Sequence, residues 1–169
     1  MIVVGTDPGT SSTGWARVTV EGGGRLPVVV TYVDAGNVES KPSTLAPLLR
    51  GADIVGVECL EGIAYPQRNA GIVTHLIASA EVAGIILGIA CARGMRTMRM
   101  PAKTWRGLVC RKPNASDAVV KNVVLRVVRG LPKTTNVHQR DALGVALGVA
   151  WSLGGDVGLQ RQMFGKGAA

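Results

Sequence analysis

The sequence predicts a mixed α/β fold, with a five-stranded mixed sheet flanked by helices on both faces. The first third of the chain contains three strand-like segments separated by turn or loop signals, which predicts an antiparallel meander. Two later apolar segments alternate with helical patterns, as parallel strands joined by helices do. No internal repeat or linker divides the chain. We therefore expect one domain over residues 1–154 and a Gly-rich, flexible tail over residues 155–169.

The meander is predicted from the first 33 residues. Residues 1–5 are apolar and lead into Thr6-Asp7-Pro8-Gly9, a turn signal with Pro and Gly in favoured places. Residues 15–20 alternate in polarity, as a half-buried strand does. The Gly-rich residues 21–25 predict a hairpin loop, and the Val-rich residues 26–33 predict the third strand.

The remaining elements alternate between helix and strand. A short helix is expected at residues 43–50, and the apolar residues 53–57 predict a strand that ends at Glu58. Residues 68–93 predict a long helix, and residues 95–100 a weaker strand. Three further helices are expected: one that begins at Pro101, one capped by Ser116, and one over residues 138–153.

The charge balance favours a polyanionic partner. Nineteen Lys and Arg residues face eleven Asp and Glu residues, which gives a net charge of +8 and a pI near 10.0. Between Glu81 and Asp117 the chain has no acidic residue but seven basic ones. A solvated face is the simpler interpretation of such a run, but its single sign favours a phosphate-binding surface.

Residues 70–92 are apolar and long enough to cross a membrane, and Gly84 and Gly88 form a GxxxG pair. However, His75, Ser79 and Glu81 lie in the middle of the segment, where a carboxylate costs roughly 2.5–3.5 kcal/mol in a bilayer. We therefore expect a buried or partner-facing helix and no membrane association.

The cysteines and the start of the chain favour the cytoplasm. The three cysteines are widely spaced and form no CxxC pair, so neither a disulfide framework nor a zinc site is indicated. Met1 leads directly into a strand-like run without the pattern of a signal peptide.

Four polar residues stand at the ends of expected elements. Asp7 follows the first strand, Glu58 ends the fourth, and His138 and Asp141 share one face of the last helix. Each alone has a simpler interpretation as a turn former, a solvated carboxylate or a surface histidine. If strands one and four are neighbours and the last helix crosses the sheet, the four side chains converge. The converging carboxylates would repel one another, and divalent cations would relieve that repulsion. A pair of Mg²⁺ or Mn²⁺ ions suits phosphodiester hydrolysis.

Four segments, in order, carry a family resemblance. They are residues 4–16 (VGTDPGTSSTGWA), 54–58 (IVGVE), 80–84 (AEVAG) and 138–146 (HQRDALGVA). Their order and spacing resemble the RuvC-type Holliday junction resolvases, whose motifs are GIDPGxxxTGxG, VxxE, A-x-G and (D/H)xxDALxxA. The resemblance extends to about Trp151 and implies an RNase H-like fold.

The resemblance also implies the activity and its residues. It implies a homodimeric, structure-selective endonuclease without a nucleotide cofactor, which resolves four-way DNA junctions by paired symmetric nicks. Asp7 would be shared by two Mg²⁺ ions, and Glu58, His138 and Asp141 would complete their ligands. Lys103 would be a basic catalytic residue near the scissile phosphate. The expected DNA-contacting residues are Arg96, Arg99, Lys103, Arg106, Arg111, Lys112, Lys121 and Tyr65.

The chain departs from the family pattern at three places. His138 stands where many members have Asp, so Mn²⁺ is expected to be tolerated well. The spacing between Glu58 and residue 80 is longer than in many bacterial members, and Ile63 and Tyr65 are candidates for the hydrophobic wedge that opens the junction. A second lysine of the family aligns with Ala118, with Lys121 one turn further on. A bacterial cytoplasmic enzyme and a viral or prophage one fit equally.

Other interpretations remain open. RuvC-like nucleases that process ribosomal RNA share the fold but usually have a basic residue after the opening glycine, where this chain has Ser11 and Ser12. A non-catalytic protein that binds branched DNA would explain the positive charge. Actin-like ATPases and sugar kinases share the Asp-x-Gly-Thr opening, but they need two such domains and a much longer chain.

Overall fold

The computed structural model describes residues 1–23, 26–60 and 70–155. Of the expected tail over residues 155–169, residues 156–169 lie outside the described residues, as do Ile63 and Tyr65.

A single mixed sheet forms the centre of the fold, in the strand order β5-β4-β1-β2-β3-β6. Strands β1, β2 and β3 form the expected antiparallel meander, and β1, β4 and β5 run parallel. The sheet has six strands rather than the predicted five, because β6 pairs in parallel with β3. A two-residue strand is too short to show any alternation in sequence. The strands are Ile2–Asp7 (β1), Ser12–Gly23 (β2), Leu26–Glu39 (β3), Ile54–Cys59 (β4), Arg96–Pro101 (β5) and Val128–Arg129 (β6).

Strands β2 and β3 are longer than their sequence patterns predict. The pairing continues from Ser12↔Glu39 to Gly23↔Leu26, with a register shift between Arg17 and Val18. The pairing passes over Val33 of β3, so the alternation of β3 is interrupted there, whereas Ala16, Val18 and Val20 of β2 stay buried at every second position. The predicted third strand, residues 26–33, ends at this bulge.

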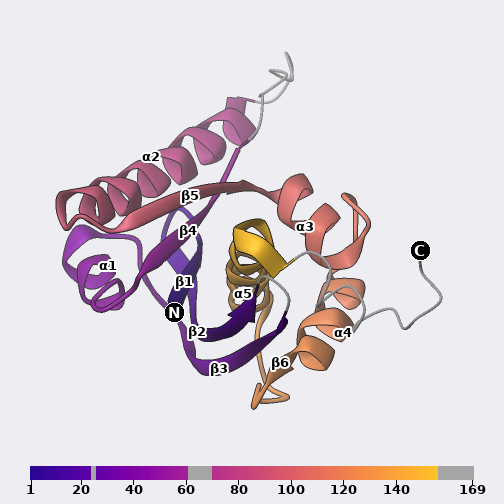
Figure 1. The fold of residues 1–169 in the computed structure, drawn as a ribbon. Coiled ribbons are helices and arrows are strands. Elements are labelled where there is room, and N and C mark those ends of the chain that lie inside the picture. The colour runs from indigo at the N-terminus through magenta and orange to yellow at the C-terminus, as the bar shows by residue number, and fades with distance from the viewer. Residues whose placement is uncertain (24–25, 61–69, 156–169) are drawn as a thin grey trace.

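Helices cover both faces of the sheet, as predicted (Figure 1). Helices α1 and α2 pack with Val4, Val55 and Val57 on one face, while α3, α4 and α5 pack with Val3 and Ile54 on the other. Neighbouring strand residues thus serve opposite cores, as the pleat requires. The helices are Pro42–Leu48 (α1), Ala70–Ala92 (α2), Ala102–Cys110 (α3), Asp117–Val127 (α4) and Val137–Ala150 (α5), followed by a π-helical turn, Trp151–Gly155.

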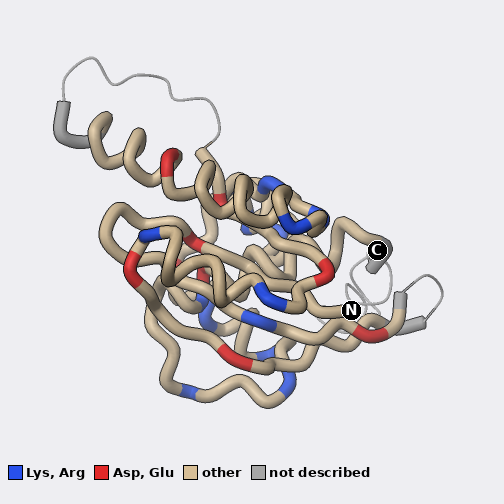
Figure 2. The backbone as a smooth tube through the Cα atoms, turned by 90° about the vertical axis from the view of Figure 1, so that its left-hand side faces the viewer, with Lys and Arg blue, Asp and Glu red and all other residues tan. Residues whose placement is uncertain are grey.

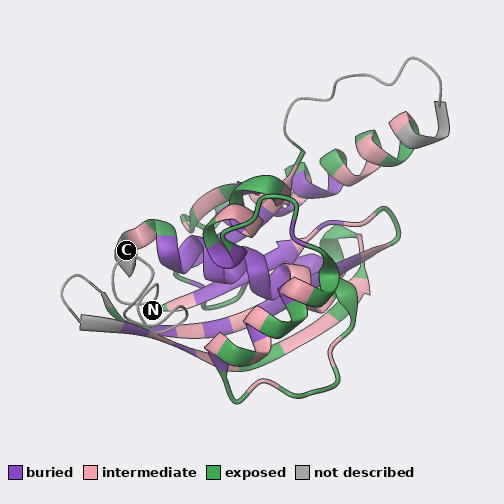
Figure 3. Cartoon of the chain, turned by 90° about the vertical axis from the view of Figure 1, so that its right-hand side faces the viewer, coloured by how far each residue is buried: buried purple, intermediate pink, exposed green. Residues whose placement is uncertain are grey.

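Helix α5 lies unusually close to the sheet and is the most completely buried helix (Figure 3). A Cβ atom at Gly5 of β1 would lie 2.1 Å from the Ala142 carbonyl oxygen, and one at Gly14 of β2 would lie 2.5 Å from the His138 carbonyl oxygen. Real Cβ atoms do not approach backbone so closely, so only glycine fits at these positions. The glycines bring the backbone of α5 directly against the strands.

The start of α5 is fixed by a capping box. The Asn136 side chain accepts a hydrogen bond from the Gln139 backbone N–H at 2.9 Å, and the Gln139 side chain accepts from the Asn136 N–H at 3.0 Å. The Asn136 side-chain amide also donates to Asn37 Oδ1 of β3 at 2.7 Å. The first turn of α5 is therefore anchored to the sheet.

Among the described helices, α2 alone is long and apolar enough to cross a membrane by length and composition. Residues 73–92 have a mean hydropathy of 1.8, and 22% of this stretch is buried. The helix contacts the sheet through Val82, Ala83 and Ile86, whereas Gly84 and Gly88 are exposed, and a Cβ atom added at either would meet no atom within 4 Å. Its expected role as a partner-facing helix stays a prediction.

Candidate active site

The ends of three elements meet at one edge of the fold. Asp7 is the last residue of β1, and Glu58 lies near the end of the neighbouring parallel strand β4, where Thr6 pairs with Val57. His138 and Asp141 lie in the first turns of α5, which the sheet glycines hold against β1 and β2. The structure therefore brings together the elements that carry the four residues selected from sequence.

Asp7 and His138 form a direct pair. His138 Nδ1 lies 2.7 Å from Asp7 Oδ2, across 131 residues of sequence. The histidine side chain is 56% exposed, whereas the aspartate side chain is 16% exposed. Asp7 therefore sits at the base of the site and the imidazole at its solvent side.

Glu58 lies in a more buried environment. Its Oε2 accepts a hydrogen bond of 2.9 Å from the indole N–H of Trp105 in α3. Burial, together with the negative charge of Asp7, raises the pKa of the Glu58 carboxyl to about 7, and the Trp105 hydrogen bond opposes this rise. The raised pKa indicates a carboxylate that lacks sufficient compensating positive charge.

Asp141 is paired with an arginine. Its Oδ2 lies 3.1 Å from Nη2 of Arg106, which also lies 3.5 Å from Asp117 Oδ1. Burial raises the pKa of Asp141 to about 6 although the Arg106 guanidinium lowers it, and Asp7 adds to the rise. Arg106 itself donates to the Ala115 carbonyl oxygen at 2.7 Å, so its guanidinium is held in place.

The donor set fits a divalent metal by its chemistry. Asp7 raises the pKa values of both Glu58 and Asp141, so the three carboxylates are close enough to repel one another. Divalent cations would remove this repulsion, and carboxylate oxygens with one imidazole nitrogen suit Mg²⁺ or Mn²⁺. As the side chains stand, however, each is engaged elsewhere, and no three His, Cys, Asp or Glu side chains of the described segments surround a common point. Metal binding therefore requires side-chain rotation away from His138 and Arg106.

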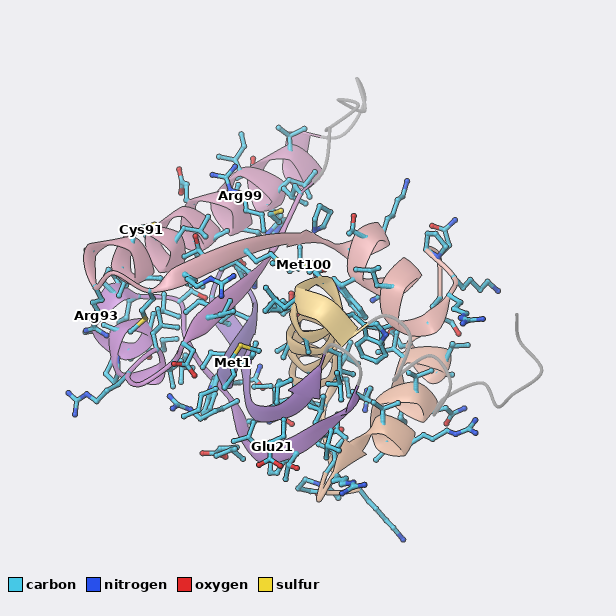
Figure 4. The ribbon with its side chains drawn as sticks, viewed as in Figure 1. Met1, Glu21, Cys91, Arg93, Arg99 and Met100 are labelled. Atoms are coloured by element: carbon cyan, nitrogen blue, oxygen red, sulfur yellow. The ribbon has the colours of Figure 1, made fainter. Side chains whose placement is uncertain are left out.

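A cavity of about 410 Å³ extends from this site beneath α2. Asp7 and Glu58 are among its lining residues, Leu76 and Leu87 of α2 add apolar surface, and Arg99 of β5 adds a positive charge. Figure 4 shows Arg99 on the α2 side of β5 and the neighbouring Met100 on the opposite side. An arginine at the rim suits a phosphate group next to the carboxylates.

Two residues next to each other in α3 contact the site, and sequence reasoning gave neither this place. Arg106 was expected on the DNA-binding surface, and Trp105 was assigned no role. Lys103, which we expected to be a basic catalytic residue, is exposed in the same helix. Arg106 instead contacts the carboxylate of Asp141. The available signal was position: both residues follow the end of β5, which pairs with β4 beside Glu58.

The basic residues expected to contact DNA lie on β5, on α3, in the segment after α3 and on α4. Lys and Arg positions are spread over several elements of the fold (Figure 2). Apart from Arg106, which is partly buried, the described members are exposed: Arg96, Arg99, Lys103, Arg111, Lys112 and Lys121. Exposure is what a DNA-contacting role requires, and that role stays a prediction.

No family model and no curated protein matches the sequence. Solved structures do match. The Thermus thermophilus RuvC structure is 21% identical with a TM-score of 0.65, over 90% of this chain and 96% of that one. The fowlpox virus Holliday junction resolvase is 15% identical with a TM-score of 0.57, over 90% and 99%. The yeast mitochondrial Holliday junction resolvase is 12% identical with a TM-score of 0.52, over 95% and 79%.

These likenesses settle the fold. It is the RNase H-like fold of RuvC-type resolvases, as the sequence motifs implied, with a slightly different number of strands. One similar structure, that of Thermus thermophilus RuvC, was solved in complex with a Holliday junction substrate.

Proposed function

We propose that the protein is a metal-dependent endonuclease that resolves four-way DNA junctions by paired symmetric nicks. The observation that carries the proposal is that the ends of β1 and β4 and the start of α5, which carry Asp7, Glu58, His138 and Asp141, lie side by side in a fold shared with known resolvases. The raised carboxyl pKa values of about 7 for Glu58 and about 6 for Asp141 support it, because strongly perturbed pKa values, here caused chiefly by burial with a contribution from Asp7, cluster at functional sites.

The chain's own residues have distinct roles in this proposal. Asp7 contributes to the raised pKa of both Glu58 and Asp141, so we assign to it the role of a ligand shared by both ions. When bound, two Mg²⁺ or Mn²⁺ ions would activate the attacking water and stabilise the leaving 3′ oxygen. Arg106 would exchange Asp141 for the negative charge of the DNA phosphate. Arg99 would receive a phosphate at the rim of the cavity.

A junction with near two-fold symmetry requires two sites in matched positions, so we propose a homodimer. The exposed apolar side of α2, with Ile77, Gly84 and Gly88, is the surface that we assign to part of the contact. A monomeric mass at micromolar concentration in analytical ultracentrifugation would contradict the dimer.

The test is cleavage of a synthetic four-way junction with Mg²⁺ or Mn²⁺, compared with linear duplex DNA and structured RNA. Paired nicks at symmetric positions on opposed strands support the proposal. Asp7→Asn removes the central carboxylate at constant shape, so it should abolish cutting while junction affinity stays equal or rises. The exposed Asp34→Asn is the matched control and should cut normally.

The alternative functions give different outcomes in the same assay. Preferential cleavage of RNA would favour an RNA-processing nuclease, and junction binding without cleavage would favour a non-catalytic DNA-binding protein. DNA affinity should fall steeply with salt, since each neutralised phosphate adds about 0.9 to the log–log slope. A DNA affinity that does not change with salt would contradict the assignment of the basic residues to the DNA interface.

A further inference from the structure

Trp105 occupies an unusual position among the three tryptophans of the chain. All three are largely or fully shielded from solvent, but the indole nitrogens of Trp15 and Trp151 have no hydrogen-bond partner within the described residues. Trp105 is 0% exposed and donates its indole N–H to Glu58 Oε2 at 2.9 Å. A buried, charge-assisted hydrogen bond of this kind is short and directional.

The indole is fixed by a notch in α5. A Cβ at Gly144 would lie 2.3 Å from Cζ3 of Trp105, and a Cβ at Gly148 would lie 3.0 Å from its Cβ. The two glycines are one helical turn apart, so together they leave a groove that the ring fills. In this groove the indole N–H faces Glu58.

The next residue of α3 holds a second carboxylate. Arg106 contacts Asp141 at 3.1 Å, and its guanidinium carbon lies 5.0 Å from the centroid of the Trp105 ring. Two consecutive residues thus reach an acid on β4 and an acid on α5. This arrangement links the spacing of the two acids to the position of α3.

We propose that Trp105 is a positioning residue for Glu58: its indole N–H, held in the Gly144–Gly148 notch, ties Oε2 and leaves Oε1 available for a metal ion. The inference rests on the proposed function, since it assigns Glu58 to metal binding. Without the indole N–H, the carboxylate is free to rotate and its charged form loses its described hydrogen bond. Residues that orient metal ligands typically contribute about 10- to 100-fold to metal affinity.

The test compares Trp105→Phe with Trp151→Phe. Both variants replace a buried indole with a smaller phenyl ring, but only the first removes a described hydrogen bond. Free Mn²⁺ in titrations of the metal-free proteins is measured by electron paramagnetic resonance. We expect Trp105→Phe to weaken Mn²⁺ binding about 10-fold or more and Trp151→Phe to leave it within about twofold of the wild type.

Equal Mn²⁺ affinity of the two variants, in a protein whose wild type cuts junctions, overturns the positioning role and leaves the proposed function standing. A wild type that neither binds Mn²⁺ nor cuts DNA overturns both. If Trp105→Phe does not fold, the double variant Trp15→Phe/Trp151→Phe keeps Trp105 as the one emitting indole. Its fluorescence should shift on addition of Mg²⁺ and on the further change Glu58→Gln, and an unchanged spectrum in both cases refutes the proposal.

Discussion

Replacing Glu58 with glutamine isolates the cost of holding this carboxylate in the metal-free protein. Glutamine has nearly the same shape, and its side-chain oxygen still accepts the hydrogen bond from Trp105. The substitution therefore removes the charge and little else. Burial raises the pKa of Glu58 from 4.5 to about 7, with the Asp7 charge as the second cause.

The sign and size follow from linkage. Because the folded-state pKa is raised, protonated Glu58 favours the folded state below pH 4.5, and this contribution is lost as the pH rises through about 7. At 1.36 kcal/mol per pKa unit, the loss for wild type is about 3 kcal/mol. Glu58→Gln should therefore be more stable than wild type at pH 8 by about 1–3 kcal/mol, allowing for relaxation, and nearly equal to it at pH 5.

Urea unfolding in EDTA between pH 5 and 8.5 measures this difference, with the exposed Glu81→Gln as the matched control. Addition of Mg²⁺ should stabilise wild type at pH 8 by mass action and stabilise Glu58→Gln less. A constant difference between wild type and Glu58→Gln across the pH range would refute the proposed burial of an uncompensated charge.

Three further predictions concern the residues around Glu58. Gly14→Ala would press a methyl group against the His138 carbonyl oxygen, so we expect the free energy of unfolding in urea to fall by about 1–3 kcal/mol and junction cleavage to be reduced. Wild-type values of both would contradict the close packing of α5. Arg106→Gln removes the cation beside Asp141, so its stability loss in EDTA should be larger at pH 8 than at pH 5, and a pH-independent loss would argue against the ion pair. Asn136→Ala breaks the capping box and should cost about 1 kcal/mol, seen as a lower Tm by about 2–4 °C; an unchanged Tm would show that the cap is dispensable.

The sequence predicted the strand ends around the site because those signals are local, and it left the pairing of β1 with β4 as a condition that the structure meets. Asp7 and Glu58 each stand at the end of an apolar run, and parallel strands place such ends at one edge of the sheet. The spacing of His138 and Asp141 follows from helix geometry alone. The four candidate site residues could therefore be selected from the order of the strands and helices and from their ends.

The partners of these residues were not accessible in the same way. Arg106 stands in a run of basic residues, and no local pattern distinguishes the one that turns inward toward Asp141 from its exposed neighbours. The bond from Trp105 to Glu58 spans 47 residues and depends on glycines in a third element. Strand β6 exists because it pairs with β3, and a segment of two residues has no sequence pattern from which that pairing could be predicted.

Helix α5 packs directly against the backbone of β1 and β2, so the same packing step completes the fold and positions residues of the proposed site. At Gly5 and Gly14 no side chain separates the backbone of α5 from the strands. A small displacement of this helix therefore moves His138 and Asp141 together. The proposed site is therefore expected to form only in molecules in which α5 is packed against β1 and β2. Protein engineers who wish to alter substrate preference should leave this helix untouched and vary the rim of the cavity at Arg99 instead.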